Sequence, residues 1–187
     1  MRVVSHNKVL ISLMKLRQRA RSQPDMISAV ELWRRAKIVL ICFPDEYQDR
    51  QAAEPALRTI VEAYPQKRFC ILTTKVLPQR WLNVELVRLR RNDLNLFSLP
   101  NSEYIRYIQY KRIDAAIDLW PPFNLTTACL CQGSGAPLRI GFSSQHAPSF
   151  YNLLVVPSGS ERALVRRYDV MVETILNLER SGVQIED

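Results

Sequence analysis

Short apolar runs recur along this chain and alternate with stretches of helical periodicity. The runs are KIVLICF (37–43), RFCILTT (68–74), VELVRL (84–89), DAAIDLW (114–120), PLRIGF (137–142) and FYNLLVVP (150–157). A nearly unbroken apolar run is typical of a strand that is buried on both faces of a parallel sheet. Strands that alternate with helices indicate an α/β fold with helices on both faces of one sheet. We therefore predict a single Rossmann-like, doubly wound, mostly parallel sheet.

The segments between these runs predict the helices that cover the sheet. Their expected ranges are about 50–64, 77–82, 101–112, 122–132 and 160–180. In the first of them, Ala53, Leu57 and Ile60 recur on one side at helical spacing, and Pro65 marks the end. Each such apolar side is expected to pack on the sheet.

Positive charge is concentrated at the beginning of the chain. Residues 1–37 hold nine Lys and Arg against two acidic residues, whereas the other 150 residues hold 17 basic and 16 acidic residues. The net charge of +8 therefore belongs almost entirely to the N-terminal segment. A local excess of this kind predicts an anionic surface as partner, such as phospholipid, a phosphorylated glycolipid or nucleic acid.

Residues 1–36 are predicted to form a basic helical arm. An amphipathic helix is expected over 7–21, and a second short helix over about 25–36. The candidate residues for binding an anionic surface are Lys8, Lys15, Arg17, Arg19 and Arg21. Docking of this arm on a membrane or a partner, and packing on its own domain, both remain open. Nucleic acid is the least expected of these partners, because no recognised nucleic-acid motif is present.

The remaining composition bears on compartment and metal content. No apolar run is long enough to span a bilayer, and the first residues offer no small-residue cleavage site, so we expect a cytoplasmic protein. The four cysteines are expected to be reduced core thiols. Cys129 and Cys131 are too close in sequence for a zinc pair. We expect neither a metal nor a cofactor.

Four segments, in order, carry a family resemblance. Residues 38–65 contain Pro55-Ala56-Leu57 and close with Tyr64-Pro65, and this resembles the opening βα unit of family nine glycosyltransferases of the lipopolysaccharide heptosyltransferase type. The segments YKRIDAAIDLW (110–120), PLRIGF (137–142) and FYN (150–152) resemble later parts of the same lobe. The resemblance extends over about 37–175. It implies one lobe of a GT-B architecture.

In that family, the N-terminal lobe receives the acceptor sugar and a second lobe binds the ADP-sugar donor. The resemblance implies a domain over 37–182 with a tail over 183–187, and it places Asp49 as the candidate general base. The candidate acceptor-binding residues are Asp118, Trp120, Asn124 and Arg139. Each has a structural alternative: a helix cap for Asp49, a turn or cap for Asp118, partial core for Trp120, an N-cap for Asn124 and a strand anchor for Arg139.

Two departures from the family pattern shape the functional expectation. Gln48 stands where the family has glycine before its loop aspartate, and no segment resembles the donor-nucleotide lobe. We therefore expect a glycosyltransferase-like protein that is linked to lipopolysaccharide or cell-surface glycan synthesis. It would not be catalytically competent alone, and would act as a binding module at the inner face of the inner membrane. One alternative is the acceptor-binding half of a split glycosyltransferase with Asp49 as general base. A second is binding of an anionic surface or nucleic acid through the basic arm. Expected partners are a glycan or glycolipid acceptor, a partner protein or second copy, and an anionic membrane.

Overall fold

The computed structural model describes residues 28–74, 83–121, 123–157 and 164–180. Its strands are β1 (Ile38–Cys42), β2 (Arg68–Thr73), β3 (Val84–Arg88), β4 (Ala115–Asp118), β5 (Leu138–Phe142) and β6 (Leu153–Val155). Its helices are α2 (Ala29–Arg35), α3 (Tyr47–Ala63), α4 (Ser102–Tyr110), α5 (Leu125–Gly133) and α6 (Leu164–Arg180), with short 3-10 turns η1 (Arg91–Asp93) and η2 (Ala147–Ser149). The expected helices over 7–21 and 77–82 and the tail over 183–187 lie outside these residues.

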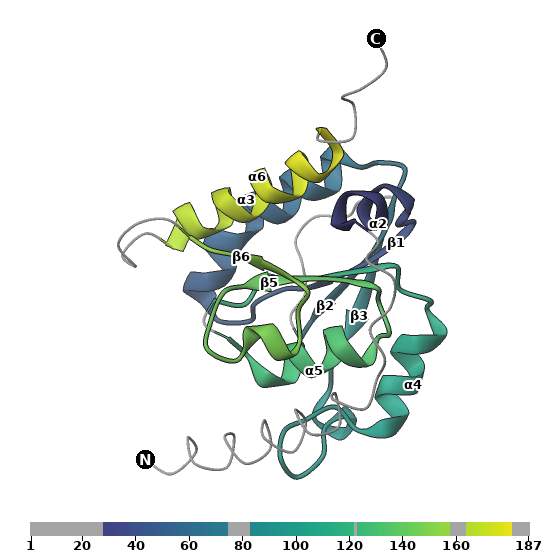
Figure 1. Cartoon of the computed structure of the whole chain (residues 1–187). Coiled ribbons are helices and arrows are strands. Elements are labelled where there is room, and N and C mark those ends of the chain that lie inside the picture. Colours follow the sequence, from purple (N-terminus) through teal and green to yellow (C-terminus); the bar gives the residue numbers. More distant parts are fainter. Residues whose placement is uncertain (1–27, 75–82, 122, 158–163, 181–187) are drawn as a thin grey trace.

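The strands form one sheet in the order β3-β2-β1-β4-β5-β6, and every pairing is parallel. β1 lies at the centre, where Val39 pairs with Phe69 on one side and Ala115 on the other. The chain therefore moves outward from β1 to β3, returns to β4, and continues outward to β6 (Figure 1). This arrangement confirms the predicted Rossmann-like α/β fold.

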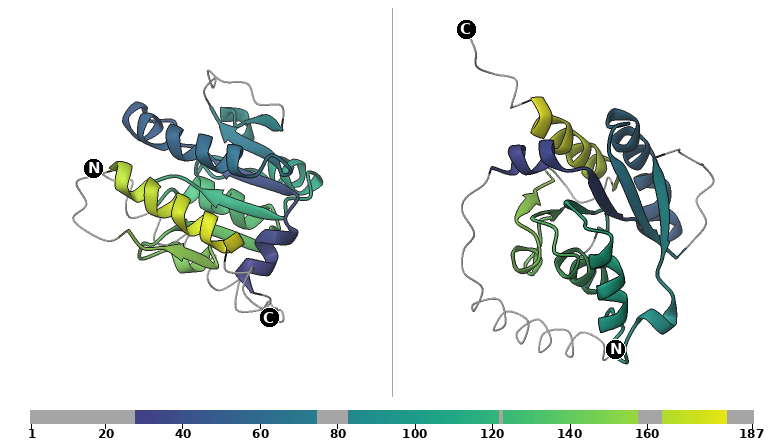
Figure 2. Two further views of the ribbon diagram at one scale, coloured as in Figure 1. Left: turned by 90° about the horizontal axis from the view of Figure 1, so that it is seen from above. Right: turned by 90° about the vertical axis from the view of Figure 1, so that its right-hand side faces the viewer.

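Helices cover both faces of the sheet, so the central strands β1, β2, β4 and β5 are buried on both faces, whereas Leu86 on the edge strand β3 stays exposed (Figure 2). On one face, α3 and α6 pack side by side with α2 against residues such as Val39 and Ile41. On the other face, α4 and α5 cover Leu40 and Cys42. Alternate residues of β1 thus enter different core layers, which explains why the run shows no polar alternation.

The short helix α2 is built into the first of these layers. Trp33 is completely buried and meets the ring of Tyr64 edge-on at 5.1 Å. The ammonium group of Lys67 donates to the carbonyls of Trp33 (2.8 Å) and Ala36 (2.7 Å) at the end of α2. A cation at a helix C-terminus interacts favourably with the last carbonyls of the helix. Residues 28–36 therefore pack with the sheet domain.

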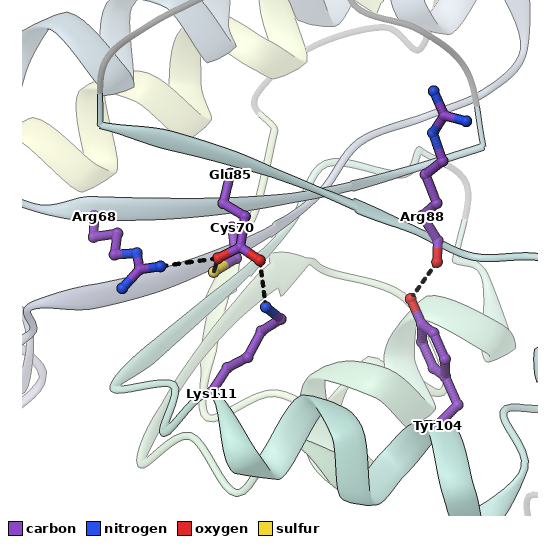
Figure 3. Close-up of polar contacts among 6 residues, drawn as sticks. All are labelled: Arg68, Cys70, Glu85, Arg88, Tyr104 and Lys111. Carbon is purple, nitrogen blue, oxygen red and sulfur yellow. Dashed lines mark hydrogen bonds and ion pairs between the residues drawn. The ribbon is translucent and has the colours of Figure 1, made fainter.

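A charged network fixes the edge strand β3 to its neighbours (Figure 3). The Glu85 carboxylate pairs with Arg68 on β2 at 3.2 Å and with Lys111 just after α4. The hydrogen bond from Lys111 is the main reason why the pKa of Glu85 is lowered, and burial partly opposes it. On the same side of the strand, the hydroxyl of Tyr104 donates to the carbonyl of Arg88 at 2.9 Å.

Two strands, β4 and β6, are at least three residues shorter than the apolar runs predicted. β4 ends at Asp118, because the following backbone turns and the amide of Trp120 donates to the side chain of Asp118 at 3.1 Å. β6 begins only at Leu153, because the amides of Phe150 and Tyr151 donate to the carbonyl of Ala147 and close a 3-10 turn at the start of the run. In both cases local turns at Pro-rich or Ser-rich positions shorten an apolar segment.

Candidate functional site

The strand order creates a topological switch point between β1 and β4. The chain leaves these adjacent strands in opposite directions, and in open α/β sheets ligands bind outside the carboxyl ends of the strands at this point. Two segments meet there: residues 43–46, between β1 and α3, and the described residues 119–121 and 123–124, between β4 and α5. We take this carboxyl edge as the candidate site.

Asp49 lies in the first turn of α3, directly after the segment that follows β1. It is half-buried, and burial raises the pKa of its carboxyl group; the charge of Glu46 adds to the rise and that of Arg167 opposes it. Among the described residues, no hydrogen bond occupies the carboxylate. Asp49 is therefore not the cap of α3, whose N-cap position is Glu46. It is a carboxylate of increased basicity that can still accept a hydrogen bond.

Helix α6 brings a second set of side chains to this edge. The hydroxyl of Tyr168 donates to the carbonyl of Leu119 at 3.1 Å, which ties the first turns of α6 to the end of β4. Burial raises the pKa of Tyr168, and the charges of Asp49 and Asp118 add to that rise. Arg167 precedes it and interacts electrostatically with Asp49.

Sequence reasoning missed Arg167 as a site residue. The available signal was topological: in a parallel sheet, the N-terminus of every helix that follows a strand lies at the carboxyl edge.

Asp118 is at the end of β4 but points into the interior, with 2% of its surface exposed. Its carboxylate accepts hydrogen bonds from the hydroxyls of Tyr151 (2.5 Å) and Thr127 (2.6 Å) and from the amide of Trp120 (3.1 Å). Burial raises the pKa of Asp118, and the three hydrogen bonds, which stabilise the ionised carboxylate, limit the rise to about 6. Asp118 thus connects β4, α5 and the segment before β6.

Trp120 and Asn124 both lie in the segment after β4. The half-buried indole of Trp120 donates from Nε1 to the carbonyl of Phe43 at 3.2 Å, which joins the ends of β4 and β1 across the switch point. The side chain of Asn124 accepts from the amides of Thr126 (2.9 Å) and Thr127 (3.3 Å) and caps α5. The N-cap alternative for Asn124 is therefore what the structure shows, and Trp120 borders the candidate site.

Arg139 is the residue that the structure separates from the others. It is the second residue of β5, near the amino end of that strand, whereas the carboxyl end is at Phe142. Its guanidinium donates to the carbonyls of Phe150 (2.8 Å) and Ala136 (2.6 Å), as the strand-anchor alternative requires. At about 3.3 Å per residue, it lies roughly 10 Å along the strand from the carboxyl edge.

Asp45 holds the segment after β1 in place. Its carboxylate accepts from the hydroxyl of Thr73 (3.3 Å) and the amide of Thr74 (3.0 Å) at the end of β2. Of the three carboxylates in the PDEYQD segment, Asp45 is therefore engaged by the neighbouring strand. Glu46 is exposed, and Asp49 interacts electrostatically with Arg167 on α6.

Within the described ranges, no group of three or more His, Cys, Asp or Glu side chains is placed to hold a metal ion. None of the helices in those ranges is long and apolar enough to cross a bilayer. The candidate anionic-surface residues Lys8, Lys15, Arg17, Arg19 and Arg21 lie outside the described residues, and their role stays a prediction.

Comparison with known proteins gives a structural match only. No protein-family model and no curated protein matches the chain. The chain is similar to a solved structure of a glycosyl transferase family 9 protein from Veillonella parvula DSM 2008, with a TM-score of 0.58 and 22% sequence identity. The similarity covers 76% of this chain and 41% of that one, so this chain spans less than half the length of its neighbour. Its described residues therefore have a fold similar to that of a single lobe of a glycosyl transferase of family nine.

Proposed function

We propose that this chain is the acceptor-binding lobe of a glycosyltransferase-like protein, and that it holds a glycan or glycolipid at the carboxyl edge between β1 and β4. The observation that carries this proposal is Asp49, a half-buried carboxylate at the switch point with a raised pKa and with no hydrogen bond among the described residues. A sugar hydroxyl donates well to such a group, and hydrogen bonds to an ionised partner are the stronger kind.

Neighbouring side chains supply further contacts for a sugar. Tyr47, in the same helical turn as Asp49, is 72% exposed and offers an aromatic face for the apolar side of a sugar ring. Arg167 supplies a cation at the same edge for a phosphate or carboxylate on the acceptor. Phosphorylated, acidic acceptors are what the resemblance to lipopolysaccharide heptosyltransferases implies, and they would place the protein at the cytoplasmic face of the inner membrane.

We further propose that the chain binds its acceptor without transferring sugar when it is alone. The described residues form one sheet with its two helical layers. In sugar transfer, the departing nucleoside diphosphate requires stabilisation by cations or by a helix N-terminus. The resemblance assigns that task to a second lobe. A donor lobe, on this protein or on a partner chain, would complete a transferase.

Calorimetry on the purified chain tests acceptor binding. A phosphorylated lipopolysaccharide-core oligosaccharide is titrated into the wild type, into Asp49→Asn, and into Glu62→Gln, an exposed acid near the other end of α3. We expect Asp49→Asn to weaken binding about tenfold or more, because a charged hydrogen-bond acceptor is lost, and Glu62→Gln to have no effect. Equal binding by all three proteins contradicts the site.

The same titration with ADP and an ADP-sugar tests the lobe assignment. The acceptor lobe is expected not to bind either nucleotide at micromolar concentration. Clear nucleotide binding that Asp49→Asn leaves intact would show that this lobe is a donor lobe.

A second candidate function assigns Asp49 the role of general base in an assembled enzyme. Burial makes its carboxylate a stronger base than an exposed aspartate, which favours removal of the proton from an attacking acceptor hydroxyl. When the donor lobe is supplied, Asp49→Asn is expected to abolish transfer. Full transfer activity in that variant would rule out the base role and leave acceptor binding as the function.

A further inference from the structure

We propose that the segment between β3 and α4 ends in a membrane-inserting tip, residues 94–100, and that Leu96 and Phe97 enter the headgroup region of an anionic bilayer. Leu96 is fully exposed and Phe97 is 58% exposed, so two adjacent large apolar side chains face solvent together. Single exposed apolar residues are common, but contiguous ones mark interaction sites. Figure 1 shows the connection between β3 and α4 at the end of the domain, beyond the layer of α4 and α5.

The tip is held in one conformation by its own hydrogen bonds. The amide of Asn95 donates to the carbonyl of Leu99 (2.8 Å), and its side-chain oxygen accepts from the amides of Phe97 (2.9 Å) and Leu99 (3.2 Å). Ser98 adopts a left-handed backbone conformation with φ of 58°, which reverses the chain after Phe97. An ordered tip loses little further conformational entropy on binding, and this favours insertion of its exposed apolar side chains.

The base of the tip is fixed to the domain. Leu99 is buried in the core layer that also contains Tyr104, and the hydroxyl of Tyr104 holds the carbonyl of Arg88 just before the segment (Figure 3). The side chain of Asn101 donates to the carbonyl of Asn92 at 2.9 Å across the base. The tip therefore projects from a rigid support.

Exposed cations flank the apolar apex in the sequence. Over residues 88–106, the chain holds four arginines and two acids: Arg88, Arg90, Arg91, Arg106, Asp93 and Glu103. All four arginines are exposed, whereas the carboxylate of Asp93 is already engaged by the amide of Arg90 at 2.6 Å. Apolar residues that insert between basic residues are the pattern of peripheral binding to anionic lipid. This charge pattern selects an anionic membrane rather than a second copy of the chain.

The tip also lies at the same edge of the sheet as the candidate site. The hydroxyl of Thr126, in the first turn of α5, donates to the carbonyl of Ser98 at 2.8 Å. That turn follows β4 and is capped by Asn124, so it belongs to the carboxyl edge. Insertion of the tip would therefore bring this edge to the bilayer surface. This inference does not depend on any role of Asp49.

A fluorescence experiment on the full chain tests insertion directly. All four native cysteines are buried, so an environment-sensitive thiol label is directed to a cysteine introduced as Leu96→Cys or, as control, Tyr110→Cys. Tyr110 is 88% exposed at the far end of α4. We expect vesicles of phosphatidylglycerol and phosphatidylcholine to shift the Leu96→Cys label to shorter wavelength, and lipids brominated in the acyl chain to quench it. The Tyr110→Cys label is expected to respond to neither.

Three results would overturn the proposal. Vesicle binding without a change at the Leu96→Cys label would assign the membrane contact to residues 1–27. A shift in the absence of vesicles that grows with protein concentration would show that the tip meets a second copy. Equal responses at Leu96→Cys and Tyr110→Cys would show that adsorption is not oriented by the tip.

Measurements of protein partitioning onto vesicles test the same proposal through loss of membrane binding. The double variant Leu96→Ser/Phe97→Ser is expected to bind these vesicles about tenfold more weakly than Tyr110→Ser, with an unchanged melting temperature because both side chains are exposed. Undiminished binding by the double variant contradicts the proposal. Binding of a lipid-free acceptor oligosaccharide is expected to be unaffected, so failure of the tip and failure of the acceptor site give different results.

Discussion

The hydroxyl of Tyr151 donates a 2.5 Å hydrogen bond to the carboxylate of Asp118, although the two residues are 33 positions apart in the sequence. Thr127 donates to the same oxygen at 2.6 Å. These contacts join the end of β4, the first turn of α5 and the segment before β6 around one buried charge. The buried Asp118 thus holds together the carboxyl edge of the sheet at the end of β4. The half-buried Asp49 lies in the first turn of α3, which follows the adjacent strand β1.

The raised pKa of Asp118 predicts how stability depends on pH. Its pKa is about 6 in the folded chain and about 3.8 in an unfolded reference, so the folded state holds this proton more tightly. The free energy of unfolding should therefore fall as the pH rises from about 4 to about 6, by roughly 3 kcal/mol. Urea unfolding across this range measures the slope, and subtracting the profile of Asp118→Asn isolates the contribution of this residue. A difference profile without a slope contradicts the assignment.

Tyr151→Phe should move that slope to higher pH. The substitution removes a donor that stabilises the ionised carboxylate, so the pKa of Asp118 rises further. The loss of stability is expected to be about 1–3 kcal/mol above the pKa and smaller below it. Urea midpoints at pH 5 and pH 8 compare the two states, and an equal loss at both would show that Tyr151 contributes only packing.

Gly141→Ala should disturb the same cluster from β5. A Cβ atom at Gly141 would lie 2.7 Å from two ring atoms of Tyr151, and an aromatic ring in a packed core cannot move aside easily. We expect a loss of about 1–3 kcal/mol in unfolding free energy. Gly133→Ala is the control, because its Cβ would meet the flexible end of Ile105. An equal or larger loss in the control would contradict this reasoning.

Lys67→Met should detach the end of α2. The substitution keeps an unbranched side chain, one atom shorter, but removes the ammonium group that donates to the carbonyls of Trp33 and Ala36. The expected cost is about 1–3 kcal/mol, with faster amide hydrogen exchange in α2 than in the rest of the domain. Lys37→Met, at an exposed position beside it, should leave exchange unchanged. Uniformly faster exchange throughout the domain would show that α2 is not held separately by Lys67.

Acceptor binding should weaken at acid pH because Asp49 must be ionised. Burial raises its pKa above that of an ordinary aspartate, so the loss of binding should begin at a higher pH than an exposed carboxylate would give. Arg167→Gln removes the cation that lowers this pKa and should shift the loss to still higher pH. Arg166→Gln, at the exposed neighbouring position, should keep the wild-type profile. Calorimetric titrations across the pH range would show which profile holds.

The cysteines should be unreactive in the folded chain. Burial raises the pKa of Cys129 to about 12, and the pKa of Cys42 lies well above its usual range, mainly because of its contact with Cys131 at 3.7 Å between the sulfur atoms. Thiol reagents attack the thiolate, so all four side chains should react only after unfolding. Ellman titration with and without denaturant measures this, and rapid reaction of the native chain would contradict the buried arrangement.

The order and type of the elements could be predicted from the sequence because burial leaves a local signature. The runs that became β1 and β2 are apolar on both sides since each strand faces two helical layers. Helix α3 showed a period of about 3.6 residues because only one side of it is buried. Helix α5 is the exception, since residues 127–131 are all buried. The position of Asp49 after the first strand followed from the same pattern.

The arrangement of the site was decided only in three dimensions. No pattern near Asp118 in the sequence predicts its contact with Tyr151, and none near Asp49 predicts its interaction with Arg167. Arg139 was grouped with the acceptor residues, but the structure puts it toward the amino end of β5.

The sequence by itself determined an α/β chain with a carboxylate after its first strand, because patterns of burial repeat within a few residues. The tertiary structure alone decided which side chains meet at the carboxyl edge. These side-chain contacts depend on the strand order β3-β2-β1-β4-β5-β6, which is set by packing among segments far apart in the chain.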